Sequence, residues 1–315
     1  MGISFEGENL GLPLALGGFT HGVSPLEMAG AYAAVSNGGV YIKPASVNRI
    51  TDRSGRVVYE RSISGERVMT EQNAFILTSM LMDAAEYGTA RRLKQTGLKL
   101  AAKTGTAIDQ NGVRDAWCAA YSPDFTAVVW MGTDSAQFGS LPAEATGGNQ
   151  PTILCGKLFQ YFYKDRSCPE FERPEGVSEL ETDLDEKENG VVYSVREGEK
   201  GTLTEYFAFG TEPKETNPDK KPPVMPEGFG WSMGEDGLPV ISFIAEPGYV
   251  YSIVRCDSGE DKVLFECKDE TGYVSFRDTD AMRYEKTKYR LMVSNPHTGE
   301  TAIGEQIEIS LNERK

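Results

Sequence analysis

The chain has 315 residues, of which 47 are Asp or Glu and 32 are Lys or Arg, so its formal net charge is −15. An acidic balance of this size excludes nucleic-acid binding through phosphate neutralisation, because that mode needs a basic surface. The five cysteines form no C-x-x-C pair and no glycine-rich phosphate loop occurs. We therefore expect neither a metal site nor a cofactor.

The sequence holds no run of 18 or more apolar residues, so we expect no membrane-spanning segment in it. Its first residues also lack the basic and apolar regions of a signal peptide. Composition and length alone favour an ordinary cytoplasmic globular protein of two or three domains.

A helix followed by a hairpin is expected near the start of the chain. Ser24-Pro25-Leu26-Glu27 is a capping box, which predicts a helix that ends at Gly38-Gly39. Residues 40–50 alternate as a strand, residues 52–55 form a turn, and residues 56–60 are expected to pair back.

A second helix is expected from Glu71 to Tyr87, with Thr70 as its N-cap and apolar side chains at helical spacing. The basic turn over residues 91–94 is interpreted as a solvated loop. It leads into a short strand over residues 98–106.

That strand ends in the tetrapeptide Lys103-Thr104-Gly105-Thr106. An edge strand can pair with an extended peptide through main-chain hydrogen bonds, and Gly105 has no Cβ to hinder such an approach. The hydroxyls of Thr104 and Thr106 and the ammonium of Lys103 suit a carboxylate, because charge-assisted hydrogen bonds to carboxylates are strong.

Two antiparallel strands and a helix are expected after the tetrapeptide. The first strand includes Trp117, the second covers residues 125–132, and Trp117 and Trp130 are candidate core residues. A last helix is expected over residues 150–163.

The second half of the chain differs in composition. Residues 175–189 are strongly acidic and predict a solvated linker or an exposed edge, and residues 217–223 form a proline-rich linker. From residue 228 onward, short alternating strands predict an immunoglobulin-like or fibronectin-like β-sandwich without a catalytic cluster. Cys256 and Cys267 lie on neighbouring candidate strands, where a disulfide is an open alternative.

In their order, the tetrapeptide and the elements after it closely resemble the C-terminal part of the transpeptidase domain of class A (bifunctional) penicillin-binding proteins. The run from Gly17 to Pro44 resembles the same family. The resemblance implies a D,D-transpeptidase that cross-links peptidoglycan stem peptides through a serine acyl-enzyme and binds β-lactams. It also implies the extracytoplasmic face of the cell membrane, against the cytoplasmic interpretation.

By this resemblance, Lys103, Thr104, Gly105 and Thr106 would bind substrate, and the Thr106 N–H would join the oxyanion hole. The family also needs a serine-x-x-lysine, and the sequence contains none. Residues 46–48 read Ser-Val-Asn and match the serine-x-asparagine pattern, but we interpret them as a decoy on a hairpin strand. We therefore expect no catalytic residue in this chain.

The resemblance and the missing motifs together predict a C-terminal portion of a transpeptidase, from a split or truncated gene or an incomplete gene model. Such a portion would be inactive alone and would need an upstream fragment that supplies the two missing motifs. Its incomplete sheet would expose an apolar face.

Two alternatives stay open. The first is a non-catalytic cell-wall binding or scaffold protein that acts through residues 226–315. The second is a complete serine hydrolase, similar to a D,D-carboxypeptidase or a β-lactamase, that uses an unusual serine.

The expected fold class is α+β: the antiparallel-sheet portion of a penicillin-binding transpeptidase fold with packed helices, followed by a small all-β sandwich. The expected domains are a transpeptidase part over residues 1–168, a tail and linker over 169–225, and a sandwich over 226–315.

Overall fold

The computed structural model describes residues 1–8, 11–133, 139–183, 192–196, 202–257, 260–281 and 286–310. The chain divides into two compact units. The first contains Met1–Leu180 and Thr204–Glu212, and the second contains Glu181–Leu203 and Pro213–Lys315. The predicted domain boundaries after residues 168 and 225 stay predictions.

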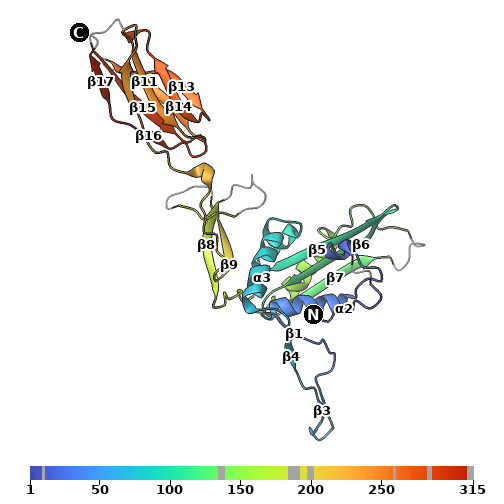
Figure 1. Cartoon of the computed structure of the whole chain (residues 1–315). Helices are drawn as coiled ribbons and strands as arrows, with labels where there is room; N and C mark the ends of the chain where they lie inside the picture. The colour runs from blue at the N-terminus through green and yellow to red at the C-terminus, as the bar shows by residue number, and fades with distance from the viewer. Residues whose placement is uncertain are drawn as a thin grey trace. The chain divides into compact units, whose positions relative to one another are not determined.

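The first unit is built around a three-stranded antiparallel sheet in the order β5-β6-β7 (Figure 1). Its sheet strands are β5 (Ala101–Asp109), β6 (Gly112–Tyr121) and β7 (Thr126–Gly132). Its helices are α1 (Leu12–Ala15), α2 (Pro25–Ser36), α3 (Glu71–Glu86), the 3₁₀-helix η1 (Arg91–Thr96) and α4 (Gln150–Phe162).

Apolar side chains cover both faces of this sheet, because successive residues of a strand point to opposite faces. On one face, Ala102 and Cys118 pack with Leu93 of η1 and Phe159 of α4. On the other face, a cluster joins Tyr121 of the sheet to residues of α2 and α3. The sheet is therefore held between η1 and α4 on one side and α2 and α3 on the other.

The predicted helix starts are confirmed. At α2, the Ser24 hydroxyl accepts from the Glu27 N–H at 3.2 Å, and the Ser24 N–H donates to the Glu27 carboxylate at 2.9 Å. At α3, the Thr70 hydroxyl accepts from the Asn73 N–H. Each cap satisfies a backbone donor that the helix itself leaves unpaired.

A two-part arm leaves the first unit between α2 and α3 (Figure 1). It consists of two antiparallel ribbons, formed by the pairs β1–β4 and β2–β3. The ribbons comprise β1 (Val40–Ile42), β2 (Arg49–Thr51), β3 (Val57–Glu60) and β4 (Gly65–Arg67).

The arm corrects two predictions about residues 40–50. The hairpin itself is confirmed, but one continuous strand is wrong, because the chain leaves strand geometry after Ile42, before Pro44, and re-enters it at Arg49. Proline cannot donate to a strand ladder and also restricts the residue before it. Residues 46–48, expected on a strand, therefore lie in the connection between β1 and β2.

Two further predictions about the first 183 residues can be compared with the structure. Trp130 is not in the core, since it is 36% exposed and lies beside Trp117 with ring centroids 6.0 Å apart. The acidic segment was predicted to be a linker or an exposed edge, and its described part forms an edge, because β8 (Val177–Asp183) pairs with β9 (Thr202–Ala208) in a two-stranded ribbon. The rest of the acidic segment, residues 184–189, lies outside the described residues.

The second unit is an all-β sandwich of two sheets that share one buried core. The sheets have the orders β10-β11-β14 and β13-β12-β15-β16, with β17 also paired to β15. The core includes Phe243 from the first sheet and Tyr251 and Leu291 from the second. The strands are β10 (Gly230–Met233), β11 (Pro239–Ala245), β12 (Val250–Asp257), β13 (Glu260–Lys268), β14 (Gly272–Arg277), β15 (Lys286–Ser294), β16 (Thr301–Ile303) and β17 (Ile307–Ser310).

Cys256 and Cys267 are both free thiols, so the disulfide alternative is wrong. The two residues do lie on the paired strands β12 and β13, but Cys256 faces Asp261 and Cys267 faces Tyr251. Five residues of strand separate these positions, roughly 16 Å at the rise of a β-strand. A disulfide needs Cα atoms within about 7 Å.

The molecule has the predicted α+β fold class, with antiparallel sheets and few helices in the first unit and, among the described residues of the second, strands with the short 3₁₀-helix η3 (Pro218–Lys220). Among the described residues, no helix is long and apolar enough to cross a membrane.

Candidate functional site

The predicted tetrapeptide lies in the middle of β5, and β5 is an edge strand. Among the described strands, β5 pairs only with β6, so its other edge carries no strand partner. The strand also continues to Asp109, three residues beyond the predicted end. The tetrapeptide is therefore held inside a regular strand, which fixes the direction of each side chain and each main-chain group.

The sheet divides the four predicted residues between two faces. Thr104 and Thr106 share the face of Ala102, which packs against η1 and α4. Lys103 and Gly105 lie on the opposite face, and the exposed ammonium of Lys103 donates to the Thr104 carbonyl at 2.8 Å. The structure thus brings the two hydroxyls together and places the ammonium at the other side of the same edge.

Both hydroxyls contact groups from distant parts of the chain. The Thr104 hydroxyl lies 2.6 Å from the Thr89 hydroxyl, and the Thr106 hydroxyl accepts from the Gly147 N–H at 3.0 Å. A hydroxyl that accepts such a bond still has its own hydrogen to donate. In the Thr89–Thr104 pair, one hydroxyl donates its hydrogen to the other, so the second hydroxyl hydrogen is still available to donate to a ligand. At least two O–H donors can therefore face a ligand here.

The Gly147 backbone lies directly against the β5–β6 ladder. A Cβ at this position would be 2.4 Å from the Gly105 carbonyl oxygen and 2.5 Å from the Trp117 carbonyl oxygen. The Gly105 and Trp117 main chains therefore face one another as a hydrogen-bonded pair. Because main-chain groups alternate along an antiparallel strand, the N–H and C=O groups of Thr104 and Thr106 point to the open edge.

An open groove of about 1000 Å³ runs beside the two threonines. Its walls are formed by the segment from the end of α3 through η1 and by the loop that precedes α4. Groups of this kind, a few convergent polar atoms in a concave surface, are typical of a small-ligand site.

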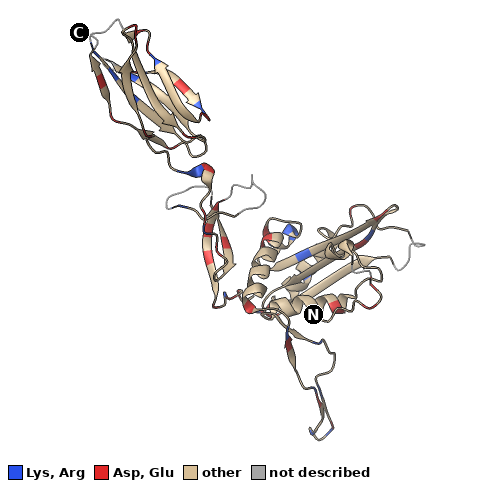
Figure 2. Ribbon diagram, viewed as in Figure 1, with Lys and Arg blue, Asp and Glu red and all other residues tan. Residues whose placement is uncertain are grey.

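Charged side chains line one wall of this groove. Glu86, Arg91, Arg92 and Lys94 all contribute to it. Lys94 forms a salt bridge with Glu86, which raises the pKa of the Lys94 ammonium. Arg91 and Arg92 are exposed and form no salt bridge with any other residue that the structure describes. The groove is therefore a locally basic part of an acidic chain, and Figure 2 shows a short basic segment after α3.

Sequence reasoning missed three contributors to this site: Thr89, Gly147 and the arginine pair. The basic turn was predicted to be a solvated loop, but its residues form the start of η1, and its exposed side chains Arg91, Arg92 and Lys94 line the groove. No spacing in the sequence indicates that residues 15 and 41 positions from the tetrapeptide donate to or accept from its hydroxyls.

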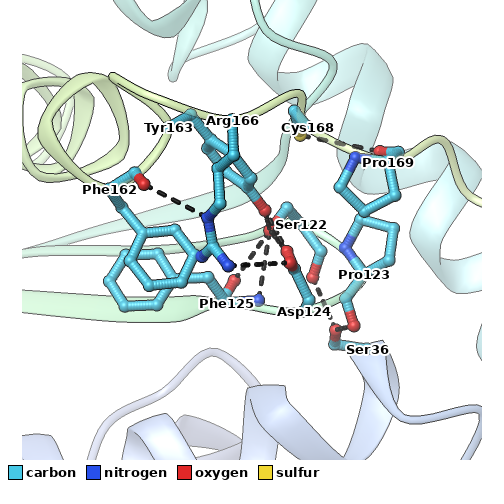
Figure 3. A network of polar contacts seen from close by, with 10 residues as sticks. All are labelled: Ser36, Ser122, Pro123, Asp124, Phe125, Phe162, Tyr163, Arg166, Cys168 and Pro169. Atoms are coloured by element: carbon cyan, nitrogen blue, oxygen red, sulfur yellow. Dashed lines mark hydrogen bonds and ion pairs between the residues drawn. The ribbon is translucent and has the colours of Figure 1, made fainter.

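A second polar cluster joins the turn between β6 and β7 to α4 (Figure 3). The Ser122 hydroxyl lies 2.6 Å from the Tyr163 hydroxyl and 3.2 Å from an Asp124 carboxylate oxygen. Tyr163 donates to the same carboxylate, and Arg166 approaches it at 3.7 Å. Burial, with the Asp124 hydrogen bond, raises the pKa of the Tyr163 hydroxyl, so it stays a neutral donor.

The Ser122 hydroxyl has more polar contacts than any other serine hydroxyl that the structure describes, but Ser122 is fully buried. Its carbonyl also accepts from the Ser36 hydroxyl at 2.7 Å, which ties the turn to the end of α2 (Figure 3). A nucleophile must reach its substrate, and no substrate atom can contact a hydroxyl without solvent exposure. The cluster is therefore structural, and it closes one end of the sheet.

Comparison with known proteins identifies the fold of the first unit. A family model described as the penicillin binding protein transpeptidase domain matches residues 3–151. The crystal structure of Penicillin-Binding Protein 1A from Haemophilus influenzae has a TM-score of 0.58 at 22% identity, over 69% of this chain and 36% of that one. The shared architecture defines the first unit as part of a penicillin-binding transpeptidase fold.

Two curated relatives narrow the class. Penicillin-binding protein 1A/1B of Bacillus subtilis is 31% identical over 226 residues, which cover 68% of this chain and 24% of that protein. Penicillin-binding protein 1F of the same organism is 36% identical over 182 residues, covering 56% of this chain and 24% of that protein. The chain is similar to the class A penicillin-binding proteins, resembles the C-terminal part of their transpeptidase domain, and spans about a quarter of these relatives' length.

Proposed function

We propose that this chain supplies the substrate-binding wall of a peptidoglycan D,D-transpeptidase. The open edge of β5, with the Thr104 and Thr106 hydroxyls beside a groove, is the observation that carries the proposal. The ligands would be the D-alanyl-D-alanine end of a stem peptide or the ring carboxylate of a β-lactam.

Each member of the tetrapeptide has a role in this proposal. The hydroxyls of Thr104 and Thr106 donate to the terminal carboxylate, and the Lys103 ammonium adds positive charge from the other side of the edge. Gly105 lets the peptide approach the strand. The Thr106 N–H, which faces the open edge, is one donor of the oxyanion hole, where a single donor is worth about 2.7–4 kcal/mol.

The nucleophile must come from a polypeptide outside this sequence, because no serine-x-x-lysine occurs in it. An upstream fragment with that motif and the serine-x-asparagine motif would pack on the sheet face that bears Lys103. The partly exposed pair Trp117 and Trp130 lies on this face and offers it an apolar contact. Such an assembly would act on the extracytoplasmic face of the cell membrane, where its substrate is found.

Binding of a peptide with neutral side chains tests whether Thr104 and Thr106 bind the terminal carboxylate. The ¹⁵N-labelled chain is titrated with Nα-acetyl-D-alanyl-D-alanine and with its C-terminal amide. We expect shifts at Thr104, Thr106 and Gly147 with the free acid and at least tenfold weaker binding of the amide, because hydrogen bonds to a charged group contribute about 1.5–3 kcal/mol each.

The matched variants are Thr104→Val/Thr106→Val and, as control, Thr51→Val on the exposed strand β2. The double variant is expected to lose the preference for the acid, and the control is expected to keep it. Equal binding of the acid and the amide by the unmodified chain would contradict the proposal that Thr104 and Thr106 bind the terminal carboxylate.

Covalent labelling tests the missing nucleophile. The chain is incubated with a fluorescent penicillin and examined under denaturing conditions, with Thr51→Val as a matched sample. We expect no covalent adduct on this chain alone. An adduct would show that the chain holds its own nucleophile and would favour the complete-hydrolase alternative instead.

A further inference from the structure

The arginine pair on the groove wall has a fixed position. Arg91 and Arg92 open the 3₁₀-helix η1, between Ala90 and Leu93. Ala90 is fully buried and Leu93 is 1% exposed, and both belong to the core cluster under the sheet. The Arg91 N–H also donates to the Gly88 carbonyl at 3.2 Å. These anchors hold the backbone of the pair in place while both side chains face outward.

The charge of the pair is not neutralised by its neighbours. Of the charged side chains on this wall, Lys94 and Glu86 form a salt bridge with one another, so their charges cancel. Arg91 and Arg92 have no carboxylate within salt-bridge distance among the residues that the structure describes, although the chain carries a net charge of −15. Two uncompensated guanidinium groups beside a groove attract an anionic group, and their planar fork fits a carboxylate.

We propose that Arg91 and Arg92 form a second anion subsite, which binds a side-chain carboxylate of the same peptide whose terminal carboxylate contacts Thr104 and Thr106. The inference rests on the proposed function and names its substrate class: an extended peptide with at least two carboxylates. The pair would then select acidic peptides over their neutral amides.

The geometry allows one peptide to reach both subsites. Thr89 is the link, because its hydroxyl lies 2.6 Å from that of Thr104 and its backbone is two residues from Arg91. Two residues of chain span at most about 7 Å, the same length that two residues of an extended ligand cover. A carboxylate on the third residue from the peptide's C-terminus therefore lies within reach of the guanidinium groups.

A pair of peptides that differ only in charge tests the subsite. The probes are Nα-acetyl-D-glutamyl-D-alanyl-D-alanine and Nα-acetyl-D-glutaminyl-D-alanyl-D-alanine, titrated into the ¹⁵N-labelled chain. We expect the glutamyl peptide to bind about three- to tenfold more tightly at low salt, the range of one or two partly exposed ion pairs. About 0.5 M NaCl is expected to remove most of this preference.

The variant Arg91→Gln/Arg92→Gln is expected to bind the glutamyl and the glutaminyl peptide equally. The control Arg53→Gln/Arg56→Gln changes the net charge equally on the arm, and it is expected to keep the preference. Amide shifts of Leu93 and Ala90 in the unliganded variants report whether η1 stays folded.

The outcomes separate this inference from the proposed function. If the unmodified chain binds both peptides equally through Thr104 and Thr106, the arginine subsite is wrong, but the proposal that the two threonines bind the terminal carboxylate is supported. If the control variant also loses the preference for the glutamyl peptide, the overall charge of the chain causes the preference, and the proposed subsite is wrong. If neither peptide shifts the threonines, both proposals are wrong.

Discussion

At the scale of single residues, the sequence predicts only those parts of the candidate site that lie close together along the chain. The tetrapeptide predicts two threonines on one face of a strand, and this pairing needs no knowledge of the rest of the chain. The partners of those threonines could not be predicted. Thr89 and Gly147 contact them only because the segment before η1 and the loop before α4 fold back over the sheet.

Gly147 gives the sharpest prediction at this scale. The substitution Gly147→Ala would place a Cβ 2.4 Å from the Gly105 carbonyl oxygen, a distance that real contacts do not reach, so the loop or the strand must move. We expect a loss of about 1–3 kcal/mol in the free energy of unfolding of the first unit, the usual cost of overpacking. Peptide binding should weaken with it, because the Thr106 hydroxyl loses its Gly147 donor.

Urea unfolding and the acid-peptide titration measure both effects. Gly230→Ala is the control, since a Cβ there would have no neighbour closer than 3.9 Å. Unfolding and binding of Gly147→Ala equal to those of the control would show that the close approach is not required.

At the scale of elements, sequence signals fixed the helices better than the strands. The capping box at Ser24 and the Thr70 cap act within three residues, and both helices begin where these caps predict. Strand ends depend on partners instead. β5 continues to Asp109 because β6 pairs with it that far, and the acidic residues 177–183 form β8 because β9 supplies a partner.

The cluster at the end of the sheet yields a prediction about how α4 is attached. Tyr163→Phe removes the hydroxyl that lies between the buried Ser122 and the exposed Asp124, so each of these polar groups loses one hydrogen-bond partner. We expect the free energy of unfolding of the first unit to fall by about 0.5–1.5 kcal/mol, the net contribution of a typical hydrogen bond, because Ser122 keeps Asp124 and Phe125 as partners. Peptide binding should be unchanged, since the cluster does not line the groove.

Tyr161→Phe is the matched control, because Tyr161 lies in α4 two residues before Tyr163 and is 79% exposed. Urea unfolding of the two variants measures the difference. Equal stability of the two variants would mean that the Tyr163 hydroxyl contributes no more to the free energy of unfolding than a solvent-exposed hydroxyl does.

At the scale of the whole molecule, each unit has a core of its own. The first unit has apolar clusters on the two faces of its sheet, and the second has one cluster between two sheets. The alternating strands after residue 228 were sufficient to predict the sandwich, because period-two alternation indicates which face is buried. The order of its strands, with β14 beside β11 and β12 beside β15, depends on pairings between distant segments that alternation does not specify.

A buried ion pair inside the sandwich gives the prediction at this scale. Arg255 donates to the Asp278 carboxylate at 2.9 Å, with side chains that are 5% and 3% exposed, and the Tyr289 hydroxyl donates to the same carboxylate oxygen at 2.7 Å. Asp278→Asn removes the negative charge that faces the buried guanidinium. We expect the free energy of unfolding of the second unit to fall by about 3–5 kcal/mol, the usual cost of breaking a buried pair from one side.

The control is Asp236→Asn, which breaks an exposed pair of the same residue types in the same unit. Arg277 approaches Asp236 at 3.1 Å, but the two side chains are 54% and 43% exposed, so the expected loss is about 0–1 kcal/mol. Loss of amide signals from each unit during a urea titration separates the stability of the sandwich from that of the transpeptidase part. Because the cores are separate, only the sandwich signals of Asp278→Asn should disappear at lower urea. An equal shift for the two variants would mean that burial adds nothing to this pair, and an equal shift of both units would mean that the two cores unfold as one.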